Sequence, residues 1–168
     1  METMKMNDGS SMNHGNMRSK NTTYKKLGIM ILVMFVSMYL IMFCMIDSVE
    51  HLIPNINNTY MTLLMTTAMV VIELIIMAEM YGNKKWNISI LTISVLIAVF
   101  SWFGIRKQLY VDDEGFIKGM IPHHAAAVLM SEQSHLTDPE LIQLKNDIIN
   151  AQKKEIQFMK TKLKELEK

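Results

Sequence analysis

The uncharged stretch from Leu27 to Ile46 limits the possible folds of this chain more than any other feature of the sequence. An α-helix rises about 1.5 Å per residue, so roughly 20 apolar residues match the roughly 30 Å hydrocarbon core of a bilayer. The stretch is longer than the apolar core of a signal peptide, and no small-residue cleavage site follows it. We therefore predict that residues 27–46 form an uncleaved transmembrane helix.

Two later apolar stretches predict two further membrane spans. Residues 60–80 form the second, which Glu73 and Glu79 interrupt, and residues 88–105 form the third. Lys and Arg are frequent before the first span and absent from the loop between the first two, residues 47–59. By the positive-inside rule the N-terminus is cytoplasmic, and the chain after the third span lies on the other side of the membrane.

Residues 1–26 are polar and contain Met12, His14 and Met17. Such a segment buries too little apolar surface to fold alone, so we expect a disordered cytoplasmic tail. Thioether and imidazole side chains suit Cu(I), which makes this tail either a copper-binding segment or an accidental methionine-rich end. The formal net charge of +1 gives no reason to expect nucleic acid as a partner.

Residues 106–168 predict a soluble module of two helices. Acidic residues begin the first helix near Asp112, and Asp138 followed by Pro139 predicts the start of the second. Two helices of this length bury too little surface to be stable alone, so the module needs support from the membrane helices or, as we favour, a second copy in a homo-oligomer. The sequence thus predicts an all-α protein, with three transmembrane helices in a membrane domain at 27–105 followed by an extracytoplasmic two-helix module.

Met120, His123 and His124 lie three and four residues apart on the first helix predicted for this module, so they share one face. On the second helix Met159 follows Glu155 at the same spacing, and antiparallel pairing would bring it opposite Met120. Thioether and imidazole together suit copper, above all Cu(I), better than zinc or calcium. The same residues are also compatible with core methionines and hydrogen-bonded histidines, and spacing alone does not separate the two interpretations.

The motifs around these residues extend over most of the module. They are Asp113-x-x-Phe116-x-x-x-Met120-Ile121-Pro122-His123-His124-x-x-Ala127-x-x-Met130, then Asp138-Pro139-Glu140-Leu141, then Ile148-Ile149-x-x-Gln152-x-x-Glu155-Ile156-x-x-Met159. The pattern, over about residues 112–163, resembles the domain-of-unknown-function 305 family, which includes the CopM-like copper-binding proteins of bacterial envelopes. The resemblance implies a ferritin-like helical module that binds copper or silver, carried by a protein of the bacterial inner membrane.

The resemblance also implies which residues act on the metal. The implied ligands are Met120, His123, His124, Met130 and Met159, and the residues implied to support them are Asp113, Gln152 and Glu155. The chain departs from the family in having Lys162 where members often have an aromatic residue, and in being short and tethered to a membrane. Its module is therefore smaller than those of many members.

Methionines recur at helical spacing along the first two spans. The first carries Met30, Met34, Met38, Met42 and Met45, and the second carries Met61, Met65, Met69 and Met77, with Glu73 in register between the last two. A step of four residues turns only about 40° around a helix, so each set forms a slowly drifting stripe. Two stripes that face each other would form a soft-metal path with Glu73 toward the bundle interior, whereas a stripe that only packs is a helix–helix seam.

The function that these observations favour is membrane-anchored binding of Cu(I), and of Ag(I), in copper homeostasis or resistance. Two alternatives remain open: transport or transfer of copper across the membrane along the methionine stripes, and a helical interaction subunit of a membrane complex that binds no metal. The sequence contains no nucleophile–base pair, phosphate loop or organic-cofactor motif, so we do not predict an enzyme. The expected partners are the lipid bilayer, the metal ion and further copies of the chain.

Overall fold

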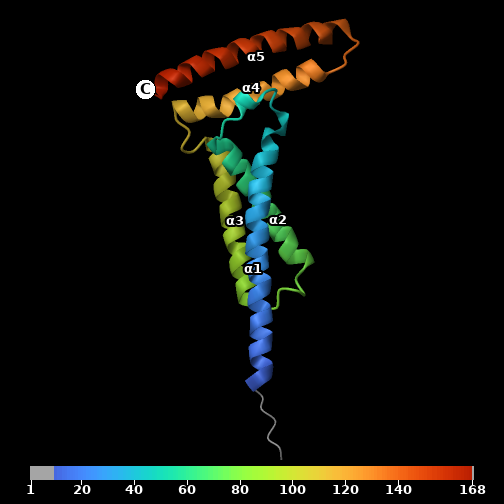
Figure 1. The fold of residues 1–168 in the computed structure, drawn as a ribbon, viewed down its shortest axis with the longest axis vertical. Helices are drawn as coiled ribbons and strands as arrows, with labels where there is room; N and C mark the ends of the chain where they lie inside the picture. Colours follow the sequence, from blue (N-terminus) through green and yellow to red (C-terminus); the bar gives the residue numbers. More distant parts are fainter. Residues whose placement is uncertain (1–9, 168) are drawn as a thin grey trace, which may run out of the picture.

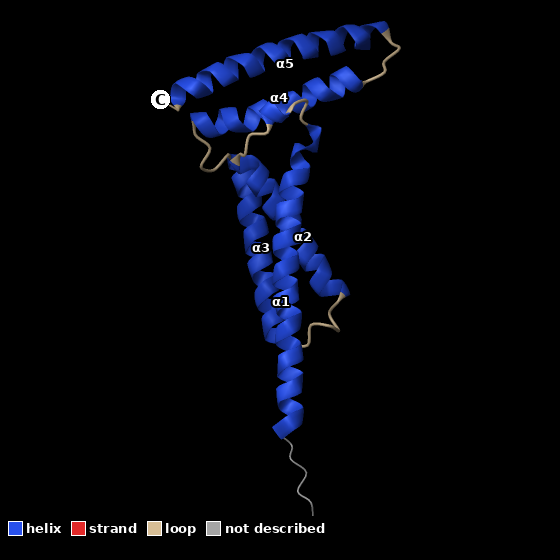
Figure 2. Ribbon diagram, in the orientation of Figure 1, coloured by secondary structure: helices blue, strands red, loops and turns tan. Residues whose placement is uncertain are grey.

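The computed structural model describes the backbone of residues 10–167 and the side chains of residues 22–167. Over the described residues the chain forms five α-helices and two short 3-10 helices, and it contains no β-strand (Figure 2). The prediction of an all-α protein is therefore confirmed. Three long helices form an elongated bundle, and the last two lie across one end of it (Figure 1).

The first helix, α1, spans Ser10–Ile41 and continues into the 3-10 helix η1, Met42–Met45. It begins upstream of Leu27, inside the segment for which we expected disorder. The physical reason is that helix propagation costs little once a nucleus exists, and the apolar stretch supplies that nucleus. The side chains of Met12, His14 and Met17 lie outside the described residues, so their copper-binding role stays a prediction.

Helices α2, Ile56–Ile76, and α3, Lys84–Lys107, follow after two polar turns. Each begins at an asparagine whose side chain accepts hydrogen bonds from the first free backbone N–H groups: Asn55 from Asn58, and Asn83 from Lys85 and Trp86. By length and composition three segments can cross a membrane, namely Thr22–Met45, Ile56–Ile76 and Lys84–Lys107. This count agrees with the prediction, although α2 begins and ends about four residues before the predicted span.

Helix α2 packs against both α1 and α3 (Figure 1). Its contact with α3 is close where Gly104 meets the ring of Tyr60: a Cβ added at Gly104 would lie 2.8 Å from Tyr60 Cε1. The Tyr60 hydroxyl donates a hydrogen bond of 2.9 Å to the carbonyl oxygen of Leu109, just beyond α3. The glycine thus lets the two helices approach, and the tyrosine fixes the chain where it leaves the bundle.

Helices α4, Asp113–Gln133, and α5, Pro139–Leu166, form an antiparallel hairpin. Asp138 begins α5 as predicted, because its carboxylate accepts hydrogen bonds from the N–H groups of Glu140 and Leu141 at 2.9 and 3.0 Å. The buried residues of the hairpin form one apolar cluster, which consists of Ile117, Ile121, Ala125, Val128, Ile156 and Met159.

The hairpin packs against one end of the helix bundle. Ile46 and Ile53, which follow α1, pack against the apolar cluster of the hairpin. Helix α4 also contacts η1, α2 and the 3-10 helix η2, Val49–His51. The helix bundle therefore supplies the support that two helices alone lack, which was one of the two arrangements considered above.

Candidate functional site

The two helices of the hairpin bring together most of the residues that the sequence singles out as ligands. Met159 of α5 is 7% exposed and belongs to the apolar cluster, and Met120 of α4 packs against that cluster from its edge. His124, one turn after Met120, places Nδ1 3.1 Å from Glu155 Oε2 on α5. Met120 therefore packs against the apolar cluster that contains Met159, and their pairing as ligands stays a prediction.

The imidazole of His124 is available for a ligand. Its Nδ1 is buried, and the contact with Glu155 lacks hydrogen-bond geometry, so this atom has no hydrogen-bond partner among the described residues. Burial lowers the pKa of His124, while the carboxylate of Glu155 opposes that shift and the neighbouring His123 adds to it. A lowered pKa favours the neutral imidazole, which is the form that binds a metal ion.

The remaining implied residues are more scattered. His123 is exposed, with its ring centroid 6.2 Å from that of His124. Gln152 is half-buried on α5, whereas Asp113 is exposed at the start of α4. Met130 is exposed and lines a separate apolar groove near the far end of the hairpin. It lies about two helical turns, or roughly 10 Å, beyond the histidines, so the structure does not place it with the other ligands.

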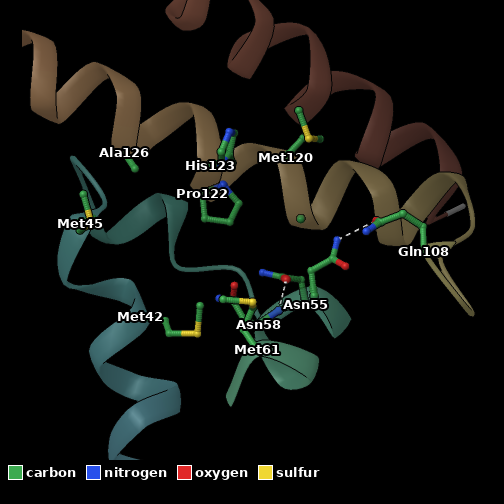
Figure 3. A pocket seen from close by; sticks show the side chains of 12 residues that line it. Met42, Met45, Asn55, Asn58, Met61, Gln108, Met120, Pro122, His123 and Ala126 are labelled. Atoms are coloured by element: carbon green, nitrogen blue, oxygen red, sulfur yellow. Dashed lines mark hydrogen bonds between the residues drawn. The ribbon is translucent and has the colours of Figure 1, made fainter. Parts of the chain in front are cut away.

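A cavity of about 510 Å³ lies on the other side of α4, between the hairpin and the outer ends of α1 and α2 (Figure 3). The thioethers of Met42, Met45 and Met61 line it, and in Figure 3 Met42 and Met61 extend toward each other. Met120 and His123 stand at its α4 edge, with Met120 directed toward α5. Four thioethers and one imidazole, from η1, α2 and α4, thus border the cavity.

Side-chain amides complete the lining of this cavity. Asn55, Asn57, Asn58 and Gln108 contribute to it, and Asn57 Nδ2 donates to Gln108 Oε1 at 3.0 Å. Asn57 Oδ1 is buried without a hydrogen-bond partner in the described part of the chain. The sequence analysis did not single out these amides, because they line the cavity only where the start of α2 lies near the α3–α4 linker.

The two methionine stripes do not face each other along their length. On α1, Met38 Sδ accepts a hydrogen bond from Thr66 at 3.9 Å, and Met42 Sδ accepts one from Thr62 at 3.5 Å. The α2 methionines stand about 100° around the helix from these threonines and are exposed, at 38% for Met61, 45% for Met65, 41% for Met69 and 37% for Met77. Met34 is half-buried on α1. Met42 and Met45 of the first stripe share a lined cavity with Met61 of the second.

Glu73 has a partner that the sequence did not suggest. Its Oε1 accepts a hydrogen bond of 3.0 Å from the hydroxyl of Tyr81, a buried residue whose ring packs 5.6 Å from that of Tyr24. Burial, and next the hydrogen bond to Glu73, raise the pKa of Tyr81 to about 12. In the described residues no group of three or more His, Cys, Asp or Glu side chains forms a metal site.

Comparison with known proteins gives a family match for the hairpin and a relative of most of the chain. Residues 111–168 match the domain of unknown function DUF305. Over 140 residues the chain is 36% identical to "Uncharacterized protein L153" of Acanthamoeba polyphaga mimivirus, a match that covers 82% of this chain and 90% of that protein. No solved structure matches the chain.

Proposed function

The chain belongs to the family of the mimivirus protein L153 and has a DUF305 domain at residues 111–168, and from this premise we propose that it is a membrane-anchored binder of Cu(I) and Ag(I). The observation that carries the proposal is the pairing of α4 with α5, in which Met120 packs against the cluster that contains Met159 and His124 faces Glu155. Such a site would serve copper homeostasis or resistance in a cell envelope, the role that the sequence resemblance implies.

The surface of the helix bundle supports a membrane anchor. Large apolar side chains are exposed all along the three long helices, among them Leu32, Ile76 and Leu96, each more than 60% exposed. The small hydroxyl residues Thr62 and Ser101 are fully buried between the helices instead. Apolar side chains outside and small polar side chains inside are typical of helices that pack in lipid, where an unpaired polar group is costly.

The donor set of the hairpin suits a soft monovalent ion. Thioether sulfur binds Cu(I) and Ag(I) and is a poor ligand for Mg²⁺ or Ca²⁺, which prefer carboxylate and carbonyl oxygen. Met120 and Met159 offer two thioethers, and the buried Nδ1 of His124 offers an imidazole nitrogen without a competing hydrogen bond. Glu155 Oε2 lies 3.1 Å from that same nitrogen, so a bound ion would take the place of this contact.

Competition with a chelator tests the proposal on the full chain in detergent micelles. The wild type should withdraw Cu(I) from a chromogenic chelator, and M120L/H124Q/M159L should bind at least about tenfold more weakly. M130L is the matched control, because Met130 lies on the same helix but away from the other donors. Circular dichroism must show that the triple variant stays helical. Equal binding by the triple variant would contradict this site, and no binding by the wild type would favour a metal-free interaction subunit.

The orientation predicted from the basic residues is part of the proposal. The hairpin would lie outside the cytoplasm of a bacterial cell, with the N-terminus inside. A reporter enzyme that is active only outside the cytoplasm, fused after Lys168, should be active. Activity of a cytoplasmic reporter at the same position would reverse the topology and with it the compartment from which the hairpin takes copper.

Transfer of copper along the bundle is a second candidate function. It is supported by Met38 and Met42, whose sulfur atoms lie within the interface of α1 and α2 rather than on the outer surface. The variant M34L/M38L should slow Cu(I) passage into vesicles that contain the protein, while M65L/M69L, on the exposed face of α2, should not. Passage at the same rate in both variants would exclude this path.

A further inference from the structure

We propose that the cavity beneath α4 is a second soft-metal site, in which Met42, Met45 and Met61 of the helix bundle are the ligands. The site deepens the proposed function, since it rests on soft-metal binding by this protein, but it uses none of the three hairpin ligands. It would make the outer end of the bundle a binding partner of the ion and not only an anchor for the hairpin.

Local geometry places two of the three thioethers together. Met42 and Met45 are the first and last residues of the 3-10 helix η1. In a 3-10 helix the side chains of residues i and i+3 eclipse each other, so these two emerge on the same side. A continuous α-helix would have turned Met45 about 60° away from Met42. The change of helix type at the end of α1 therefore gathers two sulfur ligands.

The third thioether comes from the neighbouring helix. Met61 lies near the start of α2 and extends toward Met42 across the cavity (Figure 3). Thr62 donates to Met42 Sδ at 3.5 Å, which occupies one sulfur lone pair and leaves the second free. Met45 and Met61 are 49% and 38% exposed, so their three-torsion side chains are free to close around an ion.

The charge and polarity of the cavity favour a soft monovalent cation. Its lining includes no Asp, Glu, Lys or Arg, so it neither attracts hard divalent ions through carboxylates nor repels a cation. Asn57 Oδ1 is a buried acceptor without a hydrogen bond from any described residue, and its partial negative charge would stabilise a cation in the cavity. The volume of about 510 Å³ accommodates an ion and the moving thioethers.

The position of this site relates it to the hairpin site. His123 and Met120 stand at the edge of the cavity, and His124 and Met159 lie on the α5 side of the same helix. An ion bound by Met42 and Met61 is therefore separated from His124 and Met159 by the thickness of α4. Met120, which borders both the cavity and the apolar cluster, is the residue that can exchange an ion between the two.

The number of Ag(I) ions bound by the full chain in detergent micelles tests the proposal, with Ag(I) as a redox-inert probe. The wild type should bind two ions, M42L/M45L/M61L one, and M120L/H124Q/M159L one. The control M65L/M69L/M77L removes three methionines from the exposed face of α2 and should bind two. X-ray absorption of Cu(I) in the hairpin variant should show sulfur neighbours only, because the site proposed here is built from thioethers.

Each outcome separates this inference from the proposed function. If M42L/M45L/M61L binds as many ions as the wild type, the cavity site is wrong and the hairpin site stands. If the hairpin variant still binds two ions while the cavity variant loses one, the hairpin site is wrong and the cavity site stands. If the α2 control loses as much as the cavity variant, binding follows methionine content and the cavity site is overturned.

Discussion

The hairpin and the three-helix bundle differ in how many polar side chains they bury. Every residue of the hairpin cluster is apolar, from Ile117 to Met159, and three of its members, Ile121, Ala125 and Val128, are inaccessible to solvent. The bundle buries apolar residues such as Val70 and Leu74 too, but beside them it buries hydroxyl residues, namely Thr62, Thr66, Thr67, Ser94 and Ser101. Both regions are helical, so the difference lies in the side chains that each buries.

The difference indicates which force holds each region together. Water drives the apolar side chains of the hairpin together, at about 25 cal/mol for each Å² removed from solvent. If the bundle lies in lipid, as we propose, that force is absent there, because the surroundings are as apolar as the helices, and close packing and polar contacts determine their association. Removing the same kind of atom should therefore have different consequences in the two regions.

The largest effect should come from a cavity in the hairpin. Ile121→Ala removes a side chain that is 0% exposed at the centre of the apolar cluster and should cost about 2–5 kcal/mol of stability. Leu96→Ala, at a 63% exposed position of α3, should change stability by less than about 0.5 kcal/mol. Thermal unfolding in micelles measures both. Equal losses would mean that the comparison between the two regions is wrong.

A smaller effect should come from separating α2 and α3. Gly104→Ala places a methyl group 2.8 Å from the ring of Tyr60 and should cost about 1–3 kcal/mol, because the ring also holds Leu109 and cannot simply move. Gly28→Ala is the matched control: nothing lies within 4 Å of the added Cβ, so it should be neutral or stabilise α1 by up to about 1 kcal/mol. A loss at Gly28 equal to that at Gly104 would reject close packing as the cause.

The hydrogen bond between Tyr81 and Glu73, at the end of the bundle away from the hairpin, should contribute less to stability. Tyr81→Phe leaves Glu73 without its 3.0 Å donor and should cost about 1–2 kcal/mol. Because the folded protein raises the pKa of Tyr81 from 10.0 to about 12, the unfolded chain loses this proton first as the pH rises. The contribution of Tyr81 to the free energy of unfolding is therefore present below pH 10.0 and lost as the pH approaches 12. Measuring the free energy of unfolding against pH tests this, and parallel curves for the wild type and Tyr81→Phe would contradict it.

The smallest effect should be at a helix end in water. Asp138→Ala removes the acceptor for two backbone N–H groups of α5 and should cost about 1 kcal/mol. Asp138→Asn keeps an acceptor oxygen and should retain most of that stability. Hydrogen exchange of the Glu140 and Leu141 amides localises the effect to the first turn, and unchanged exchange in the alanine variant would mean that α5 begins without this cap.

The sequence predicts those features of the fold that depend on a single helix or on two helices joined by a short loop. The three apolar segments and the start of α5 at Asp138 follow from length, composition and capping chemistry. The packing of Met120 against the cluster that contains Met159 follows from spacing and a short connection between two helices. Each of these expectations needs no knowledge of how a helix is rotated against a distant neighbour.

The sequence does not predict which neighbour a stripe meets. Spacing shows that Met61, Met65 and Met69 share a face. The structure shows that a different face of α2 packs against the first stripe, because Thr62 and Thr66 donate to the sulfur atoms of Met42 and Met38. The Tyr81 partner of Glu73 likewise depends on a turn whose path no local pattern specifies. The cavity beneath α4 is formed jointly by the hairpin, η1 and α2, so no single sequence motif predicts it.

The placement of the hairpin across the ends of the bundle has a consequence for encounters between copies (Figure 1). If the bundle stands in a bilayer, as we propose, every bundle has the same depth and every hairpin occupies one thin layer parallel to the lipid surface. Copies would then search for one another in two dimensions and arrive already upright, which removes much of the translational and rotational entropy that association in solution would cost. A weak contact through the apolar groove at Met130 would therefore act at a far higher effective concentration than it would on a free hairpin.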